Sequence, residues 1–334
     1  MKRLLAVITC LILIIGLCAC GGKTENSANQ TSPNAEVSTA AKGETASSDY
    51  PLTVTDDLGT QMTLAKKPVN IVSLTLGADE VLFSIVEKSR IKGITYFADD
   101  PGISNITAQA KDFPTKLYAD NAEKIIALQP DLVIIDTYAK KEFVQQLRDA
   151  GIPVYQYEPP FNIDQNKRII LSIARLVGEK EKGEELVSWM DNKLKEVSDR
   201  VSKLKPEERL TVLDYSEMGT TSGKNTNFDD LVTRAGLINA AAKAGLEGWP
   251  QISKEKIVEI NPDIIMVPAW VYDKNKSTQS IIDSLKGDKS LAGVKAIKNN
   301  RIIAPNYAHL SSVSQYAVLA VEDIAKAAYP ELFK

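Results

Sequence analysis

The chain has 334 residues, of which 44% are hydrophobic and 25% are charged, and its formal net charge is -3. This composition is typical of a globular protein and leaves no basic face for nucleic acid, so we expect no nucleic-acid partner. The length allows one large domain or two ordinary ones.

The first twenty residues have the pattern of an export signal. Lys2 and Arg3 precede an uncharged run over 4–19, which is short, N-terminal and basic at its front. The run ends Leu17-Cys18-Ala19-Cys20-Gly21. Small residues before a cysteine resemble the lipobox of bacterial lipoproteins, and this resemblance implies that Cys20 becomes the lipidated first residue of the mature chain. The alternatives are an ordinary signal peptide and an uncleaved anchor helix.

No cysteine follows Cys20, so the mature chain can form no internal disulfide and depends on its hydrophobic core for stability. Residues 21–49 contain almost no large apolar side chain. Such a segment cannot bury enough surface to offset the entropy of ordering, and we interpret it as a flexible tether.

Strands and helices alternate over residues 50–160, which predicts a parallel sheet with helices on both faces. We name this segment the N-terminal lobe. The predicted elements are a hairpin over 52–64, strands near 70–74, 91–96, 132–136 and 153–157, and helices over 78–86, 121–128 and 140–150.

Residues 161–206 interrupt this alternation, because they contain no strand-like run. An apolar stripe with steps of three and four residues predicts one long helix, formed by Leu186, Met190, Leu194, Val197, Val201 and Leu204. Gly178 separates it from a preceding helix, and Pro206 ends the segment. A coiled-coil dimer is the alternative, but the stripe is short for one. We expect the long helix to lie across two lobes as a backbone.

The alternation resumes over residues 207–334, the C-terminal lobe. The predicted elements are strands over 210–215, 264–268 and 300–304, and helices over 228–235, 253–260 and 314–329. Within this lobe, residues 255–267 repeat residues 123–135 without a gap, with five of thirteen positions identical. The sequence therefore predicts an α/β fold with two Rossmann-like lobes, each with a parallel sheet, and a ligand cleft between them.

Aromatic residues follow the predicted strands, at the end of a parallel sheet where ligands bind. They are Tyr96, Phe97, Tyr138, Tyr157, Tyr215, Trp270 and Tyr307. Tyr118 and Trp249 lie in loops before the two repeated helices. Facing aromatic rings suit a large, ring-bearing ligand. The alternative is that the rings pack beneath loops; Trp249 and Trp270 are the strongest candidates.

His309 is the only histidine of the chain and follows a predicted strand. It could touch the metal of a bound chelate or haem, as could Tyr307, or be an ordinary loop residue. The sequence has no cluster of cysteine and histidine for a bare metal ion, so we expect no metal site and no resident cofactor.

Several segments in this order resemble the bacterial substrate-binding lipoproteins that deliver iron-siderophores, haem and cobalamin to ABC importers. They are Val54-Thr-Asp-Asp-Leu-Gly, Pro68-Val-Asn-Ile-Val-Ser-Leu, the repeated segment from Glu123, Thr221-Ser-Gly-Lys with Phe228-Asp-Asp-Leu-Val, and Gly248-Trp-Pro-Gln-Ile-Ser. The resemblance covers about residues 52–330. It implies two α/β lobes joined by one long helix, as the apolar stripe predicts independently.

Glu123 and Glu255 occupy the same position in the two repeat copies, two residues after the capping residues Asn121 and Ser253. A glutamate in a first helical turn is explained by the helix dipole alone. The resemblance implies a further role, because glutamates at this position in the family reach arginine pockets on the two permease subunits of the importer.

The leading hypothesis is therefore a non-catalytic, extracytoplasmic protein, anchored to the membrane by lipid, that passes a metal chelate to a permease dimer. An iron-siderophore is the first candidate, and a corrinoid or haem comes next, although no arginine cluster follows the strands to favour an anionic catecholate. A sensor subunit with the same fold is one alternative. An exported hydrolase is another, but the chain has no Gly-x-Ser-x-Gly elbow and His309 is its only histidine.

Overall fold

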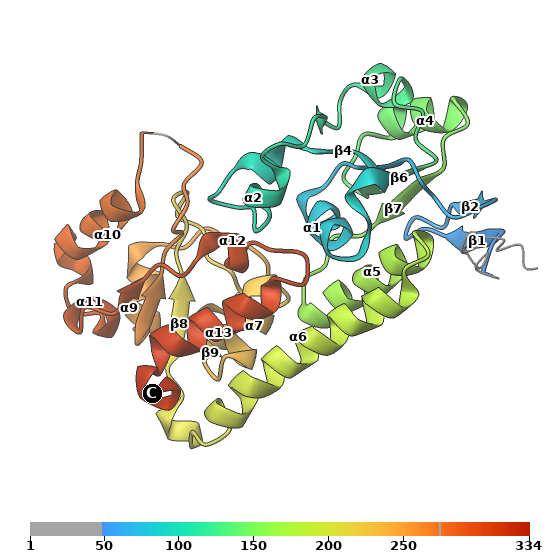
Figure 1. The fold of residues 1–334 in the computed structure, drawn as a ribbon. Coiled ribbons are helices and arrows are strands. Elements are labelled where there is room, and N and C mark those ends of the chain that lie inside the picture. The colour runs from blue at the N-terminus through green and yellow to red at the C-terminus, as the bar shows by residue number, and fades with distance from the viewer. Residues whose placement is uncertain (1–48, 274) are drawn as a thin grey trace, which may run out of the picture. The chain divides into compact units, whose positions relative to one another are not determined.

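A computed structural model describes residues 49–273 and 275–334 (Figure 1). The predicted signal peptide, Cys20 and all but the last residue of the tether lie outside the described residues. Among the helices that are described, none is both long and apolar enough to span a membrane.

The N-terminal lobe contains a sheet of five parallel strands in the order β5-β4-β3-β6-β7. Its strands are β3 (Ile71–Ser73), β4 (Ile91–Thr95), β5 (Lys116–Leu117), β6 (Leu132–Asp136) and β7 (Val154–Tyr157). Its helices are α1 (Leu76–Ile85), α2 (Thr107–Ala110), α3 (Ala122–Ile126) and α4 (Lys141–Asp149), with short 3-10 turns η1 (Lys88–Arg90) and η2 (Tyr96–Asp99). The predicted hairpin is confirmed as the antiparallel pair β1 (Leu52–Thr55) and β2 (Gln61–Leu64).

The C-terminal lobe contains four parallel strands in the order β11-β10-β8-β9. They are β8 (Thr211–Asp214), β9 (Ile238–Asn239), β10 (Ile264–Met266) and β11 (Ile302–Ile303). The helices are α7 (Asn227–Arg234), α8 (Ala240–Lys243), α9 (Lys254–Ile260), α10 (Thr278–Gly287), α11 (Lys295–Lys298), α12 (Tyr307–Leu310) and α13 (Ala317–Ala328), with 3-10 turns η4 (Lys289–Leu291) and η5 (Pro330–Phe333). The predicted α/β class with two parallel sheets is thus confirmed. The sequence did not reveal β5 and β9, because two residues carry no alternating pattern.

Two helices link the sheets, α5 (Ile163–Leu176) and α6 (Lys180–Val201), before the 3-10 turn η3 (Pro206–Glu208). The chain turns between them at Gly178, whose φ of 67° suits glycine. The predicted stripe of α6 faces inward, and its Met190, Val197 and Val201 are buried. Helix α6 packs against α5, against α1 of the N-terminal lobe and against α7 and α13 of the C-terminal lobe, as Figure 1 shows.

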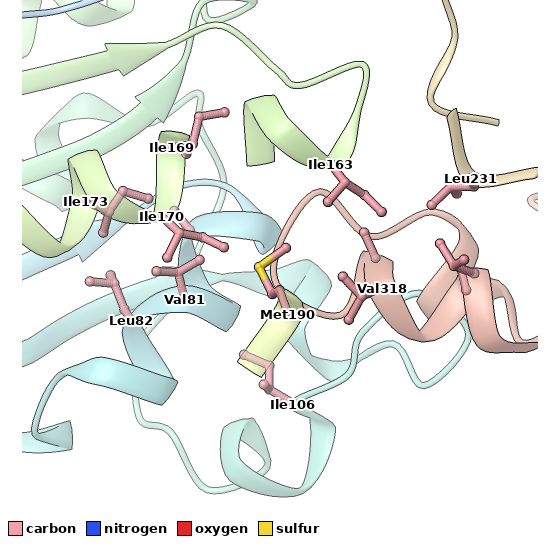
Figure 2. Close-up of a cluster of buried hydrophobic side chains, with 14 of the residues drawn as sticks. Val81, Leu82, Ile106, Ile163, Ile169, Ile170, Ile173, Met190, Leu231 and Val318 are labelled. Atoms are coloured by element: carbon pink, nitrogen blue, oxygen red, sulfur yellow. The ribbon is translucent and has the colours of Figure 1, made fainter. Parts of the chain in front are cut away.

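Both faces of each sheet are buried, and alternate residues of a strand enter different cores. Ile71 and Val212 belong to a central cluster that includes α1, α5, α6, α7 and α13, and Figure 2 shows Val81, Met190 and Val318 within it. Val72 instead joins an outer cluster under α3 and α4, and Leu213 joins one under α9 and α10. The central core is therefore shared by the two lobes.

A buried carboxylate of α1 also joins the lobes. Glu80 accepts hydrogen bonds from the Asn105 backbone amide and side chain, both at 2.9 Å, and from the hydroxyls of Ser312 and Ser314. Asn105 donates in turn to the Ala308 carbonyl at 2.9 Å. Helix α13 begins at Ala317 and not at 314 as predicted, because residues 314–316 form a turn whose Ser314 is bonded to Glu80 of the N-terminal lobe.

Candidate functional site

The repeated segment builds the same structure in both lobes. Asn121 and Ser253 cap α3 and α9. The side chain of each accepts a hydrogen bond from the backbone amide three residues later in the chain. Each helix is followed by a left-handed residue, Gln129 with φ 48° and Asn261 with φ 49°. Asp131 then accepts from the backbone amides of Val69 and Asn70, just before β3, and Asp263 accepts from that of Thr211, the first residue of β8.

Glu123 and Glu255 start these helices with exposed side chains. Hydrogen bonds from its own backbone amide and from Ser253 lower the pKa of Glu255. Within the described part of the chain, neither carboxylate forms an ion pair, so both are available to an external cation. Their docking role stays a prediction.

A cavity of about 300 Å³ opens at the carboxyl ends of β8 and β10. Strand β8 connects to β9 on one side of this pair, and β10 connects to β11 on the other side. The point between β8 and β10 is therefore the switch point where open parallel sheets bind ligands. The cavity is lined by Asp214, Ser216, Glu217, Met218, Ser222, Asn227, Phe228, Trp249, Pro268, Trp270, Tyr272, Tyr307, Leu310 and Ser311. All of these residues belong to the C-terminal lobe.

Aromatic rings form one wall of this cavity. Trp270 stacks on Tyr307 with 5.9 Å between ring centroids and meets Tyr272 edge-on at 6.3 Å. Tyr272 is 79% exposed and Trp249 is 56% exposed, although each offers a large apolar surface. Exposed rings gathered around a cavity indicate a place for an apolar or flat ligand.

The cavity lining also contains polar and acidic residues. Asp214 ends β8 and accepts from the Ser222 hydroxyl at 2.7 Å. Its carboxyl keeps some exposure to the cavity but lies deep in the protein, and burial raises its pKa to about 6 against the hydrogen bonds that favour ionisation. Burial, followed by the negative charges of Asp214 and Glu217, raises the pKa of Tyr307, which therefore remains a neutral phenol.

Three predicted aromatics of the N-terminal lobe form a separate stack. Tyr96 lies on Phe97 with centroids 4.1 Å apart and on Tyr118 at 4.0 Å. They do not line the cavity. Burial raises the pKa of Tyr96, and the nearby phenols of Tyr118 and Tyr272 raise it further.

Gly102 of the N-terminal lobe touches the cavity wall directly. A Cβ built on this glycine would stand 1.8 Å from Cδ1 of Trp270, so only glycine permits the approach. Trp270 is thus held between the 100–105 loop and the Tyr307 ring.

The remaining predicted residues lie elsewhere. Tyr138 is 73% exposed beyond β6, and Tyr215 packs against the outer core of the C-terminal lobe. Tyr157 was expected beyond its strand, but it lies within β7, buried, with its hydroxyl 2.7 Å from that of Thr75. His309 Nδ1 is 2.6 Å from Asp323 of α13, and its ring does not line the cavity.

The site also contains residues that the sequence reasoning missed, chiefly Asp214, Glu217, Asn227 and Tyr272. Asp214 carried a usable signal, because a carboxylate that ends an apolar strand at a switch point is well placed for a ligand. No group of three or more possible metal ligands occurs in residues 49–273 and 275–334.

The family model described as "Periplasmic binding protein" matches residues 71–306. The chain belongs to this family of extracytoplasmic solute-binding proteins, whose members bind substrates for ABC importers.

Two curated proteins and one solved structure illustrate its relatives. The chain is 26% identical over 330 residues to the ABC transporter substrate-binding lipoprotein YvrC of Bacillus subtilis, covering 97% of this chain and 96% of that protein. It is 26% identical over 281 residues to a cobalamin-binding protein of Halobacterium salinarum, covering 84% and 73%. The apo periplasmic heme-binding protein RhuT from Roseiflexus sp. RS-1 superposes with a TM-score of 0.66 at 27% identity, covering 79% and 98%.

Proposed function

We propose that this protein is a lipid-anchored receptor that captures a metal chelate outside the cytoplasm and delivers it to the permease of an ABC importer. The observation that carries the proposal is the aromatic cavity at the switch point between β8 and β10. The ligand classes considered are iron-siderophores first, then cobalamin and haem. Relatives bind haem and cobalamin, and both of these ligands offer a ring system that could lie on aromatic side chains.

The anchor is proposed from the N-terminal sequence. Leu17-Cys18-Ala19-Cys20 has the order of a lipidation site, and YvrC is named a lipoprotein. Mass spectrometry of membrane-extracted protein should find an acylated Cys20 as the first residue. A Cys20→Ala variant that stays fully membrane-bound through an intact N-terminal helix would overturn this part of the proposal.

The cavity can be tested with the three tryptophans of the chain. Trp249 and Trp270 line the cavity, whereas Trp189 lies on α6 and packs against the central core. We expect Trp249→Ala and Trp270→Ala each to weaken chelate binding about tenfold or more, since burial of a ring is worth about 1–3 kcal/mol. Trp189→Phe should leave it unchanged. Fluorescence quenching and visible spectra with ferric siderophores, cobalamin and haem measure this, and unchanged affinity in both cavity variants would place the site elsewhere.

A further inference from the structure

We infer that the cavity selects a chelate that presents hydrogen-bond donors or positive charge, and that it discriminates against anionic chelates. This inference rests on the proposed function and specifies the ligand's chemistry at the same site. It is carried by the polar residues Asp214, Glu217 and Asn227, which line the cavity together with the aromatic rings and which we call the polar wall.

The polar wall has an excess of acceptors. One oxygen of Asp214 accepts from Ser222, whereas Glu217 Oε2 and Asn227 Oδ1 are shielded from solvent and lack a hydrogen-bond partner in the described structure. Ionised carboxylates only accept hydrogen bonds, so Asp214 and Glu217 in the cavity lining favour a ligand that brings donors. The wall is therefore suited to a ligand that brings N–H groups.

The described lining of the cavity contains acids but no basic residue. None of the lining residues is a lysine or arginine among the described residues. Lys276 approaches from an exposed loop, but its ammonium donates to the backbone carbonyl of Glu217 at 3.3 Å and does not line the cavity. An anionic group placed here would face two carboxylates, and no lysine or arginine of the described lining would offset the repulsion.

The aromatic wall favours the same kinds of ligand. The faces of Trp249, Trp270 and Tyr307 carry negative π density, which attracts cations and stacks with flat rings but offers nothing to an anion. Two chelate classes are complementary to both the acidic and the aromatic lining residues: a neutral macrocycle with peripheral amides, and a cationic hydroxamate complex of iron. Ferric tricatecholates, haem with its propionates, and molybdate are not.

The inference can be tested with the full chain in detergent and chelates of known charge. The probes are cyanocobalamin, which is neutral and bears amides, cationic ferrioxamine B, a ferric tricatecholate, haem and molybdate. We expect the tightest binding from cyanocobalamin or ferrioxamine B, at least tenfold tighter than any anionic probe. Tightest binding by an anionic probe would overturn the inference but leave the proposed function intact. Binding of no chelate would overturn both.

Variants of the polar wall assign the selectivity to named residues. Asp214→Asn and Glu217→Gln should each lower the affinity for the preferred chelate about tenfold. Each should also reduce the difference in affinity between that chelate and the anionic probes. Glu142→Gln, at an exposed position of α4, is the matched control and should change neither. If Asp214→Asn does not fold, the measurement on Glu217→Gln is sufficient to test the inference. Unchanged affinity and unchanged selectivity in the folded variants would overturn the inference.

Discussion

At the residue scale, Asp214 is an acid kept at the end of β8 at a cost to stability. Its pKa is raised from 3.8 to about 6, mainly by burial. The folded state therefore favours the neutral carboxyl more than the unfolded chain does. The stability that this group contributes is lost as pH rises from about 4 to about 6. A residue that is unfavourable for the fold at neutral pH is more easily explained by ligand binding than by folding.

Asp214→Asn is expected to stabilise the ligand-free protein. A shift of this size corresponds to about 3 kcal/mol for a fully shielded group, and because the carboxyl retains exposure to the cavity we expect about 1–2 kcal/mol at pH 7.5 and almost none below pH 4. Urea unfolding at the two pH values measures it.

Asp263→Asn is the control with the opposite sign. Burial works against ionisation of Asp263, but hydrogen bonds from Thr211 and Lys295 outweigh it and lower the pKa. Loss of this charge should destabilise the protein at neutral pH. Destabilisation by both asparagine variants would show that Asp214 serves the fold.

Ligand affinity should depend on the same carboxyl. A donor-bearing chelate favours ionised Asp214, so its affinity is full above about pH 6 and falls as pH drops through this value. Glu217, Tyr272 and Tyr307 also line the site, and Lys276 lies at the Glu217 backbone. The raised pKa of Tyr307 keeps its phenol neutral over this range. Titrations from pH 5 to 8 should show the fall in the parent protein, and a smaller fall in Asp214→Asn.

At the scale of elements, the loop after η2 positions the aromatic wall. A methyl group on Gly102 would overlap the Trp270 ring, so Gly102→Ala must displace the ring or the loop. We expect about tenfold weaker chelate binding and an altered near-ultraviolet dichroism signal. Gly293→Ala, where nothing lies within 4 Å of the added Cβ, is the control. Full affinity in Gly102→Ala would mean that the position of Trp270 does not limit binding.

At the scale of the whole molecule, Glu80 and α6 resist relative motion of the lobes. Glu80 gathers four donors, two of them from the segment before α13, and although burial raises its pKa, these hydrogen bonds oppose that shift. Glu80→Gln should lower unfolding stability by about 2–4 kcal/mol, because an amide group replaces one acceptor oxygen. Urea unfolding measures this, and a loss below about 0.5 kcal/mol would contradict the proposal that the Glu80 hydrogen bonds hold the lobes together.

The same contacts predict a small change in radius of gyration on ligand binding, since a helix shared by both lobes bends less than extended hinge strands. Small-angle scattering with and without the chelate tests this expectation. A decrease of the size seen in full hinge closure would contradict it.

Transport should depend on two carboxylates far from the cavity. We expect the double variant Glu123→Ala with Glu255→Ala to keep its chelate affinity, because neither side chain lines the cavity. Uptake, and stimulation of the importer's ATPase in reconstituted membranes, should fall sharply if the pair meets permease arginines. Glu142→Ala, an exposed glutamate on α4, is the control. Normal transport by the double variant would contradict the docking role and would mean that the two glutamates only stabilise the first turns of their helices.

The sequence by itself determined the repeated helix and strand, the apolar stripe of α6 and the break at Gly178, because periodicity and local caps act over a few residues. It also singled out aromatics at strand ends and in the loops before the repeated helices, of which Trp249, Trp270 and Tyr307 line the cavity. Only the tertiary structure decided that Asp214 faces the cavity while Tyr215 packs into the outer core. Successive residues of a strand point to opposite faces, and which face meets the site depends on packing between segments far apart in the chain.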